Sequence, residues 1–224
     1  MRTIRVIQFS LLFLLVASCS SYTFTKRDNP FSQYGINVVY VPTFYNKSVF
    51  SNVSANFTRE IKWLLSEYPG LEVTESPDKA DAVLIGIIDS KKKMTQAIQN
   101  EGYRVSSEVA PNSVNPANRN QFYVPAITSI NLSVRFILIK HPTESELALL
   151  QTSLGDKIES SSKVVFNQEL FLTEQFNREI YDKTAGNDAG NVNATQNRGA
   201  LQRTLKNLAV SAKQNFKDLI IYAF

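Results

Sequence analysis

A run of seven apolar residues at positions 82–88 (AVLIGII) constrains the fold of this chain more than any other segment. An unbroken apolar run of this length is typical of a strand that is covered on both faces. Gly86 inside the run predicts a bulge or a close approach of another backbone or a helix. Asp81, directly before the run, is expected to accept backbone N–H groups at a turn. We therefore predict a buried strand that begins just after Asp81.

Four other segments have the pattern or the composition of strands. Residues 130–138 have the clearest period-two pattern, because Ile130, Leu132 and Val134 alternate with polar residues. The other predicted strands are residues 36–44, 71–75 and 164–172. Pro42 is expected near the end of its strand or at a sheet edge, since proline cannot donate to a strand ladder.

Two segments repeat apolar residues at the spacing of amphipathic helices. The first begins at Ser54, stops at Pro69-Gly70 and has one apolar face made by Phe57, Ile61, Leu64, Leu65 and Tyr68. The second spans residues 201–219, with Lys206, Lys213 and Lys217 off its apolar face. Together with the strands, the helices predict an α+β fold of two layers: a mixed sheet of roughly four to five strands with two helices on one face.

Polar segments separate these elements in three places. Residues 95–125 are predicted to be a long polar excursion, such as an extended hairpin, and residues 182–199 a loop rich in Asn and Gly. Residues 143–162 fit a loop, with a short helix at 146–150 as an alternative. We expect residues 36–224 to form one domain that includes these loops.

The N-terminus has the organisation of an export signal. Arg2 and Arg5 precede an apolar run at residues 6–17, which is shorter than the roughly 20 residues that a membrane-spanning helix needs. Small residues follow, so residues 1–18 are predicted to be a cleaved signal peptide. Its removal takes away two arginines and no acid, which lowers the formal charge from +4 to +2.

The lone cysteine, Cys19, lies where the signal ends, in the sequence Val-Ala-Ser-Cys. This resembles a bacterial lipobox, in which the cysteine receives diacylglycerol and acyl groups and becomes the first mature residue. The alternative is an ordinary signal peptide with an incidental cysteine. With the lipobox, residues 19–35 are predicted to be a lipidated tether, held at the membrane by the acyl chains. Ser20 rather than Asp follows the cysteine, which resembles lipoproteins sent to the outer membrane.

Composition argues against several classes of function. A single cysteine and a single histidine, His141, make a disulfide framework, a metal site or histidine-based catalysis unexpected. The sequence contains no phosphate-binding glycine loop and no nucleophile elbow. We therefore expect no enzyme and no cofactor besides the lipid groups on Cys19. Nucleic-acid binding is not expected either, because the mature excess charge is small.

Two segments carry a resemblance to a known family. Residues 36–48 (INVVYVPTFYNKS) and 71–89 (LEVTESPDKADAVLIGIID), together with the lipobox, resemble the LptE family of lipopolysaccharide-assembly lipoproteins. The resemblance implies a protein on the periplasmic face of the outer membrane that plugs a lipopolysaccharide-exporting β-barrel, assists its folding and binds lipopolysaccharide. A different periplasmic lipoprotein, one that docks on a cell-wall synthase or a secretion pore, is the alternative.

The densest basic cluster is the candidate ligand site. Lys91, Lys92 and Lys93 follow the buried strand, and Arg104 lies on the returning part of the excursion. Such charges would attract the phosphorylated sugars of lipopolysaccharide. The alternative is a solvated loop or a protected edge strand, for which lysine is a common choice.

The lipobox interpretation has a direct test. We expect Cys19→Ala to leave the protein without lipid, because the thiol is the only acceptor that the lipobox provides. Metabolic labelling with a fatty-acid analogue measures this. Continued labelling of the Cys19→Ala protein would contradict the assignment.

Overall fold

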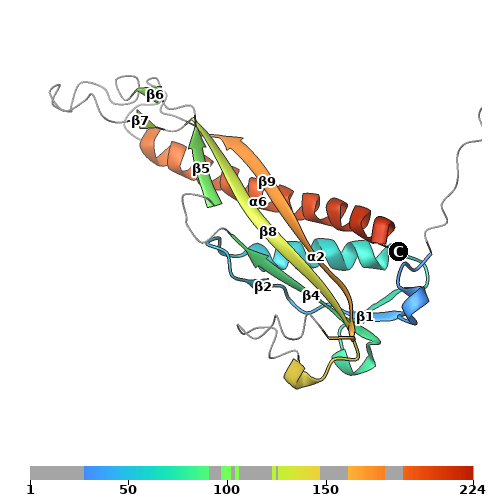
Figure 1. The fold of residues 1–224 in the computed structure, drawn as a ribbon. Coiled ribbons are helices and arrows are strands. Elements are labelled where there is room, and N and C mark those ends of the chain that lie inside the picture. Colours follow the sequence, from blue (N-terminus) through green and yellow to red (C-terminus); the bar gives the residue numbers. More distant parts are fainter. Residues whose placement is uncertain are drawn as a thin grey trace, which may run out of the picture.

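The computed structural model describes residues 28–90, 97–101, 104–105, 123–124, 126–146, 161–179 and 189–223. It confirms the α+β class: a mixed sheet forms one layer, and two helices form the other (Figure 1). The helices are α2 (Val53–Ser66) and α6 (Ala189–Ala223). The strands of the main sheet are β1 (Val38–Tyr40), β2 (Tyr45–Asn46), β3 (Glu72–Thr74), β4 (Ala82–Asp89), β5 (Ile98–Glu101), β8 (Ile127–Lys140) and β9 (Val164–Asn177).

The sheet has seven strands, more than the four or five expected, because the short strands β2 and β5 add to it. Strand β1 lies between β3 and β4 and is parallel to both, while β2 pairs in parallel with the far end of β4. Strand β8 is antiparallel to β4, β5 and β9. Strand β8 is therefore the central strand of the sheet, between β4 and β9.

Strand β4 matches the prediction of a strand covered on both faces, since its first five residues are all buried. Leu84 and Ile88 belong to the main core beneath the helices. Val83 and Ile85 point to the other face, where they form a second apolar cluster with Ile137 and Ile139 of β8. The unbroken apolar run is therefore the consequence of two apolar clusters that share one strand.

A chain of aromatic rings joins the sheet to the helices. Phe44 meets Phe136 of β8 edge to face at 5.8 Å, and Phe136 stacks on Phe216 of α6 at 4.2 Å between ring centroids. Phe216 in turn meets Phe166 of β9 edge to face at 5.8 Å. All four rings are buried, and such pairs add about 1 kcal/mol each to the gain from burial.

The strand predicted at residues 36–44 is wrong in its extent. Only Val38–Tyr40 form β1, and Tyr45–Asn46 form the separate strand β2. Pro42 has no N–H for a strand ladder, and the N–H of Phe44 donates to Thr58 Oγ1 of α2 at 2.9 Å instead of to a strand. The chain therefore bends at this point and directs Phe44 into the core.

The predicted tether over residues 19–35 is also too long. Phe31 is buried in the main core, and the buried side chain of Asn29 donates to the carbonyl oxygens of Ile36 at 2.7 Å and Gly70 at 3.2 Å. The folded part therefore begins by Asn29, because one buried aromatic ring and one buried amide fix this turn.

The loop predicted at residues 182–199 is wrong from Ala189 onward, where α6 begins. Asn and Gly disfavour helix, but propensity is a weak constraint when a helix continues into a well-packed segment. Asn197 also exchanges two hydrogen bonds of 2.9 Å with the backbone of Glu179 after β9. This contact holds the early part of α6 against the end of the sheet.

The other two predicted loops are only partly described. Within 95–125, β5 joins the main sheet, and β6 (Arg104–Val105) pairs with β7 (Tyr123–Val124) in a separate two-stranded sheet. Within 143–162, residues 144–146 form a helical turn, slightly before the short helix considered at 146–150. The remaining residues of both segments lie outside the described part of the chain.

Gly86 has the close approach that the sequence predicts, although the approaching group is the ring of Phe44 rather than a backbone. A Cβ at this position would overlap the Phe44 ring. We expect Gly86→Ala to lower the free energy of unfolding by about 3 kcal/mol, since overpacking a core displaces its side chains. Urea unfolding measures the change.

Gly199 in α6 provides the matched control for this prediction. A Cβ at Gly199 would lie 3.6 Å from a guanidinium nitrogen of Arg203, an ordinary contact. Gly199→Ala is therefore expected to stabilise the helix by roughly 0.5–1 kcal/mol. Equal stability of the Gly86→Ala and Gly199→Ala variants would show that the packing of Phe44 does not require a glycine at position 86.

Candidate functional site

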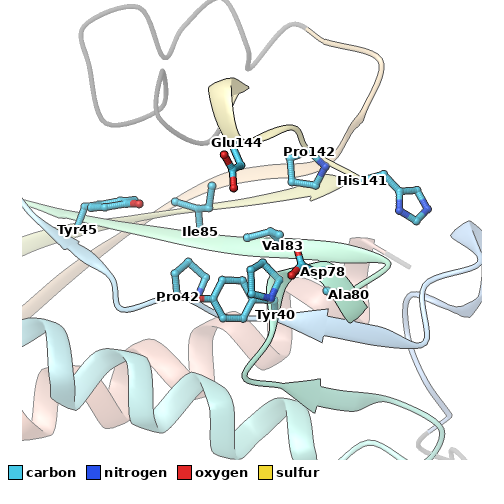
Figure 2. Close-up of a pocket in the computed structure, with 11 residues that line it drawn as sticks. Tyr40, Pro42, Tyr45, Asp78, Ala80, Val83, Ile85, His141, Pro142 and Glu144 are labelled. Atoms are coloured by element: carbon cyan, nitrogen blue, oxygen red, sulfur yellow. The ribbon is translucent and has the colours of Figure 1, made fainter.

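The face of the sheet opposite the helices carries a pocket of about 550 Å³ (Figure 2). Its apolar part comes from Val83 and Ile85 of β4 and from Pro42, and Tyr40 and Tyr45 add two aromatic rings. The remaining lining residues belong to the 3-10 helix Pro77–Lys79 and to the chain after β8; they are Pro77, Asp78, Ala80, His141, Pro142 and Glu144.

Strand alternation places the apolar residues in this pocket. Successive side chains of a strand point to opposite faces, so Val83 and Ile85 face away from the helices, whereas Leu84 faces them. Tyr45 reaches the same face because β2 pairs beside Ile87 of β4. The pocket is thus the surface-accessible margin of the second apolar cluster.

The charged groups at this pocket are carboxylates. Figure 2 shows Glu144 on the side of the pocket opposite Tyr40 and Pro42, Asp78 near Val83, and the ring of His141 turned away from Ile85. No lysine or arginine lines the pocket among the described residues. The arrangement can receive an apolar or aromatic group on its floor and a cationic or hydrogen-bond-donating group at its carboxylates.

A reciprocal cap fixes the turn that carries Glu144. The N–H of Thr143 donates to Glu146 Oε2 at 2.7 Å, and the N–H of Glu146 donates to Thr143 Oγ1 at 3.3 Å, which is a capping box. Lys163, just before β9, contacts both carboxylate oxygens of Glu146 at 2.9 Å. These contacts hold the pKa of Glu146 below its ordinary value, and the hydrogen bond from the Thr143 N–H has the largest effect.

Asp81 follows Ala80 of the pocket lining and binds the backbone at the start of β1. Its Oδ2 accepts the N–H groups of Asn37 and Val38, both at 2.9 Å, as the sequence predicts. Its carbonyl oxygen accepts the N–H of His141 at 3.0 Å. The two hydrogen bonds to the carboxylate lower the pKa of Asp81 from its ordinary value of 3.8, and the bond from Asn37 has the larger effect.

A second hollow of about 480 Å³ lies along β8 and β9 on the same face. Six of its nine lining residues have polar side chains, among them Asn131, Ser133, Glu169 and Thr173. Thr173 Oγ1 donates to Asn131 Oδ1 at 2.8 Å. Phe171 also lines it, although 76% of this residue is exposed. Phenylalanine is enriched in the cores of protein interfaces, so Phe171 is a candidate anchor for a binding partner.

None of the residues predicted from sequence as sites is among the described residues that line these hollows. Cys19 and Lys91, Lys92 and Lys93 lie outside the described residues. Arg104 is on β6, opposite Val124, and the structure describes its backbone only. The pocket itself is absent from the sequence predictions, because its residues come from four separate segments. The one available signal was the concentration of Tyr and Pro at residues 40–45, which the sequence analysis assigned to the strand.

Two further observations concern only the described residues. They contain no group of three His, Cys, Asp or Glu side chains that could hold a metal ion. None of the helices there is both long enough and apolar enough to cross a bilayer.

Comparisons with known proteins do not assign the chain to a family. No family model matches it, and no curated protein matches it. Among solved structures, rare lipoprotein B from Shewanella oneidensis is 7% identical, with 83% of this chain and 95% of that chain covered and a TM-score of 0.36. A lipoprotein B from Nitrosomonas europaea is 11% identical, with 88% and 86% covered and a TM-score of 0.35. Lipoprotein GNA1162 from Neisseria meningitidis is 12% identical, with 73% and 97% covered and a TM-score of 0.32.

The hydrogen bonds of Asp81 predict a pH dependence. A carboxyl whose pKa is lowered by folding stabilises the protein above its unfolded pKa, and this contribution is lost as the pH falls through the folded pKa. We expect Asp81→Asn to reduce the free energy of unfolding at neutral pH by about 1 kcal/mol. This is less than the roughly 1.5–3 kcal/mol typical of a hydrogen bond to a charged group, because the carboxyl lies near solvent. The difference from the unmodified protein should shrink below pH 3.8.

Urea unfolding of both proteins at neutral and at acidic pH measures this difference. A gap between the two that stays constant with pH would show that the charge of Asp81 does not matter. In that case the hydrogen bonds would act through geometry alone.

Proposed function

We propose that this protein is a lipid-anchored subunit at the periplasmic face of the outer membrane, which assembles with and plugs a lipopolysaccharide-exporting β-barrel. In this role it assists the insertion of lipopolysaccharide into the outer membrane. The lipobox and the LptE-like segments support the assignment. We propose a binding and assembly role without enzymatic activity, and no cofactor beyond the lipid groups on Cys19.

The observation that carries the proposal is the polar face of β8 and β9. On the side away from the helices, β8 and β9 pair Asn131 with Thr173, Ser133 with Phe171, and Arg135 with Glu169. Each strand has 14 residues, a length of about 45 Å. Wide membrane barrels have a polar, wet interior behind an apolar band about 25 Å tall, so a long polar sheet face fits such an interior.

Two residues of the family-like segments have clear structural roles in this chain. Phe44 lies against Gly86, and Asp81 binds the N–H groups that lead into β1. Each of these residues determines how the first strand meets β4. The residues that carry the resemblance therefore build the domain of this chain, and the barrel and lipopolysaccharide contacts are proposals. Binding of lipopolysaccharide by Lys91–Lys93 and Arg104 stays a prediction.

The two hollows provide the anchoring points that a partner needs. Interfaces depend on a few buried aromatic or apolar groups surrounded by polar contacts. Phe171 offers such a group to a partner, and the pocket with Val83 and Ile85 offers a place to receive one. Both lie on the face that the helices leave free.

Affinity purification of the tagged lipoprotein from solubilised outer membrane tests the proposal. We expect recovery of a large β-barrel in stoichiometric amount. Recovery of a cell-wall synthase or secretion pore would favour the alternative role, and recovery of no barrel would reject the proposal. The open face is tested by Phe171→Asp, which should reduce recovery of the barrel at least tenfold because a charge cannot enter a desolvated contact.

Ile221→Asp is the matched control. Ile221 is 59% exposed and lies on α6, in the other layer. This variant should recover the barrel like the unmodified protein. If Phe171→Asp also retains the barrel, the contact lies elsewhere on the molecule.

A further inference from the structure

The positive charge of this protein is concentrated in its two helices. Helix α6 carries five basic residues and one acid, and α2 carries two basic residues and one acid. The two helices together therefore have a formal charge of +5, which exceeds the +4 of the entire chain. The acid-lined pocket occupies the opposite face of the sheet. The domain is thus electrically polarised across its two layers.

Four of the five basic residues of α6 form a stripe. The spacing i, i+3, i+10 and i+14 places Arg203, Lys206, Lys213 and Lys217 along one side of the helix, with Val210 between them. At 1.5 Å per residue this basic stripe is about 21 Å long. Arg203, Lys206 and Val210 are exposed, and Lys213 and Lys217 are partly buried.

Helix α2 lies beside this stripe and adds an aromatic group (Figure 1). Lys213 Nζ is 3.3 Å from Glu60 Oε2 and 4.1 Å from the centroid of the Trp63 ring. Arg59 also contacts Glu60, at 3.2 Å. Glu60 is thus a buried acid with two cationic partners, and Trp63 remains 57% exposed next to the stripe. Tryptophan flanked by basic residues is typical of surfaces that rest at a lipid–water interface.

Chain length keeps this surface close to a bilayer. Cys19 precedes Asp28, the first described residue, by nine positions. A fully extended segment of that length spans at most about 30 Å. This step rests on the lipid anchor of the proposed function and is independent of the barrel.

We propose that the basic stripe and Trp63 dock on the anionic phospholipid headgroups of the bilayer to which the protein is anchored. Lysine and arginine side chains bind the phosphate groups, and the indole ring enters the headgroup region. The docking belongs to the anchored subunit before it engages a partner, since the open face of the sheet is left free.

Trp63 is the single tryptophan of the chain, so its fluorescence reports on this surface directly. The experiment uses the mature protein with Cys19→Ala, which removes the acyl chains. The protein is titrated with vesicles of equal parts phosphatidylglycerol and phosphatidylcholine, and with vesicles of phosphatidylcholine alone. We expect a blue shift of the emission with the anionic vesicles only, and its loss at high salt.

Charge-reversal variants distinguish an effect of the basic stripe from an effect of the net charge of the protein. Arg203→Glu with Lys206→Glu should weaken vesicle binding by at least about 30-fold, because the loss of each basic residue at an anionic surface costs about a factor of five and the new carboxylates are repelled. The matched control is Lys47→Glu with Lys79→Glu, which changes the net charge equally at two exposed lysines outside α2 and α6. This control should weaken binding only a few-fold, and circular dichroism verifies that both variants are folded.

Three results would overturn the proposal. One is the absence of a blue shift with anionic vesicles, and another is an equal response to phosphatidylcholine alone. The third is an equal loss of binding in the two double variants. A protein that ignores vesicles but still recovers the barrel would reject docking on lipid and leave the proposed function intact.

Discussion

The ring of Phe44 on the bare backbone of Gly86 is the contact on which the two layers depend. Because β4 has no side chain at this point, the ring can lie against the strand and still meet Phe136 of β8. Phe136 stacks on Phe216 of α6, and Phe216 meets Phe166 of β9. The two strands on either side of β8 and the long helix are therefore joined through four rings that begin at one glycine.

This packing also determines where binding can occur. The helices and the aromatic rings cover one face of the sheet, so the opposite face holds both hollows and Phe171. Asp81 lies at the start of β4 and joins the chain before β1 to the backbone of His141. The strand that organises the core thus also positions the rim of the pocket. A change at its start is expected to affect both stability and the geometry of the pocket.

Periodicity predicts the parts of this fold in which neighbouring residues carry the information. The runs at 82–88 and 130–138 and the apolar faces of the two helices, which include Phe57 of α2 and Phe216 of α6, each show a regular pattern. The structure confirms these elements. The sequence predictions are wrong where contacts between residues far apart in the chain determine the structure. Asn197 holds a helix of low propensity against Glu179, Thr58 takes the N–H of Phe44, and Phe31 is packed into the core. The pocket belongs to the same class, since no local pattern shows that Tyr40, Asp78 and Glu144 will meet.

The two layers differ in charge as well as in packing, and with the proposed lipid anchor this difference would give the domain a preferred orientation. The helices carry a formal charge of +5, while carboxylates line the pocket on the other side. If the domain is tethered within about 30 Å of an anionic surface, the surface attracts the basic helices and repels the carboxylates of the pocket. Docking through the basic stripe would then present Phe171 and the pocket away from the bilayer. In that orientation the membrane and a protein partner do not compete for the same face.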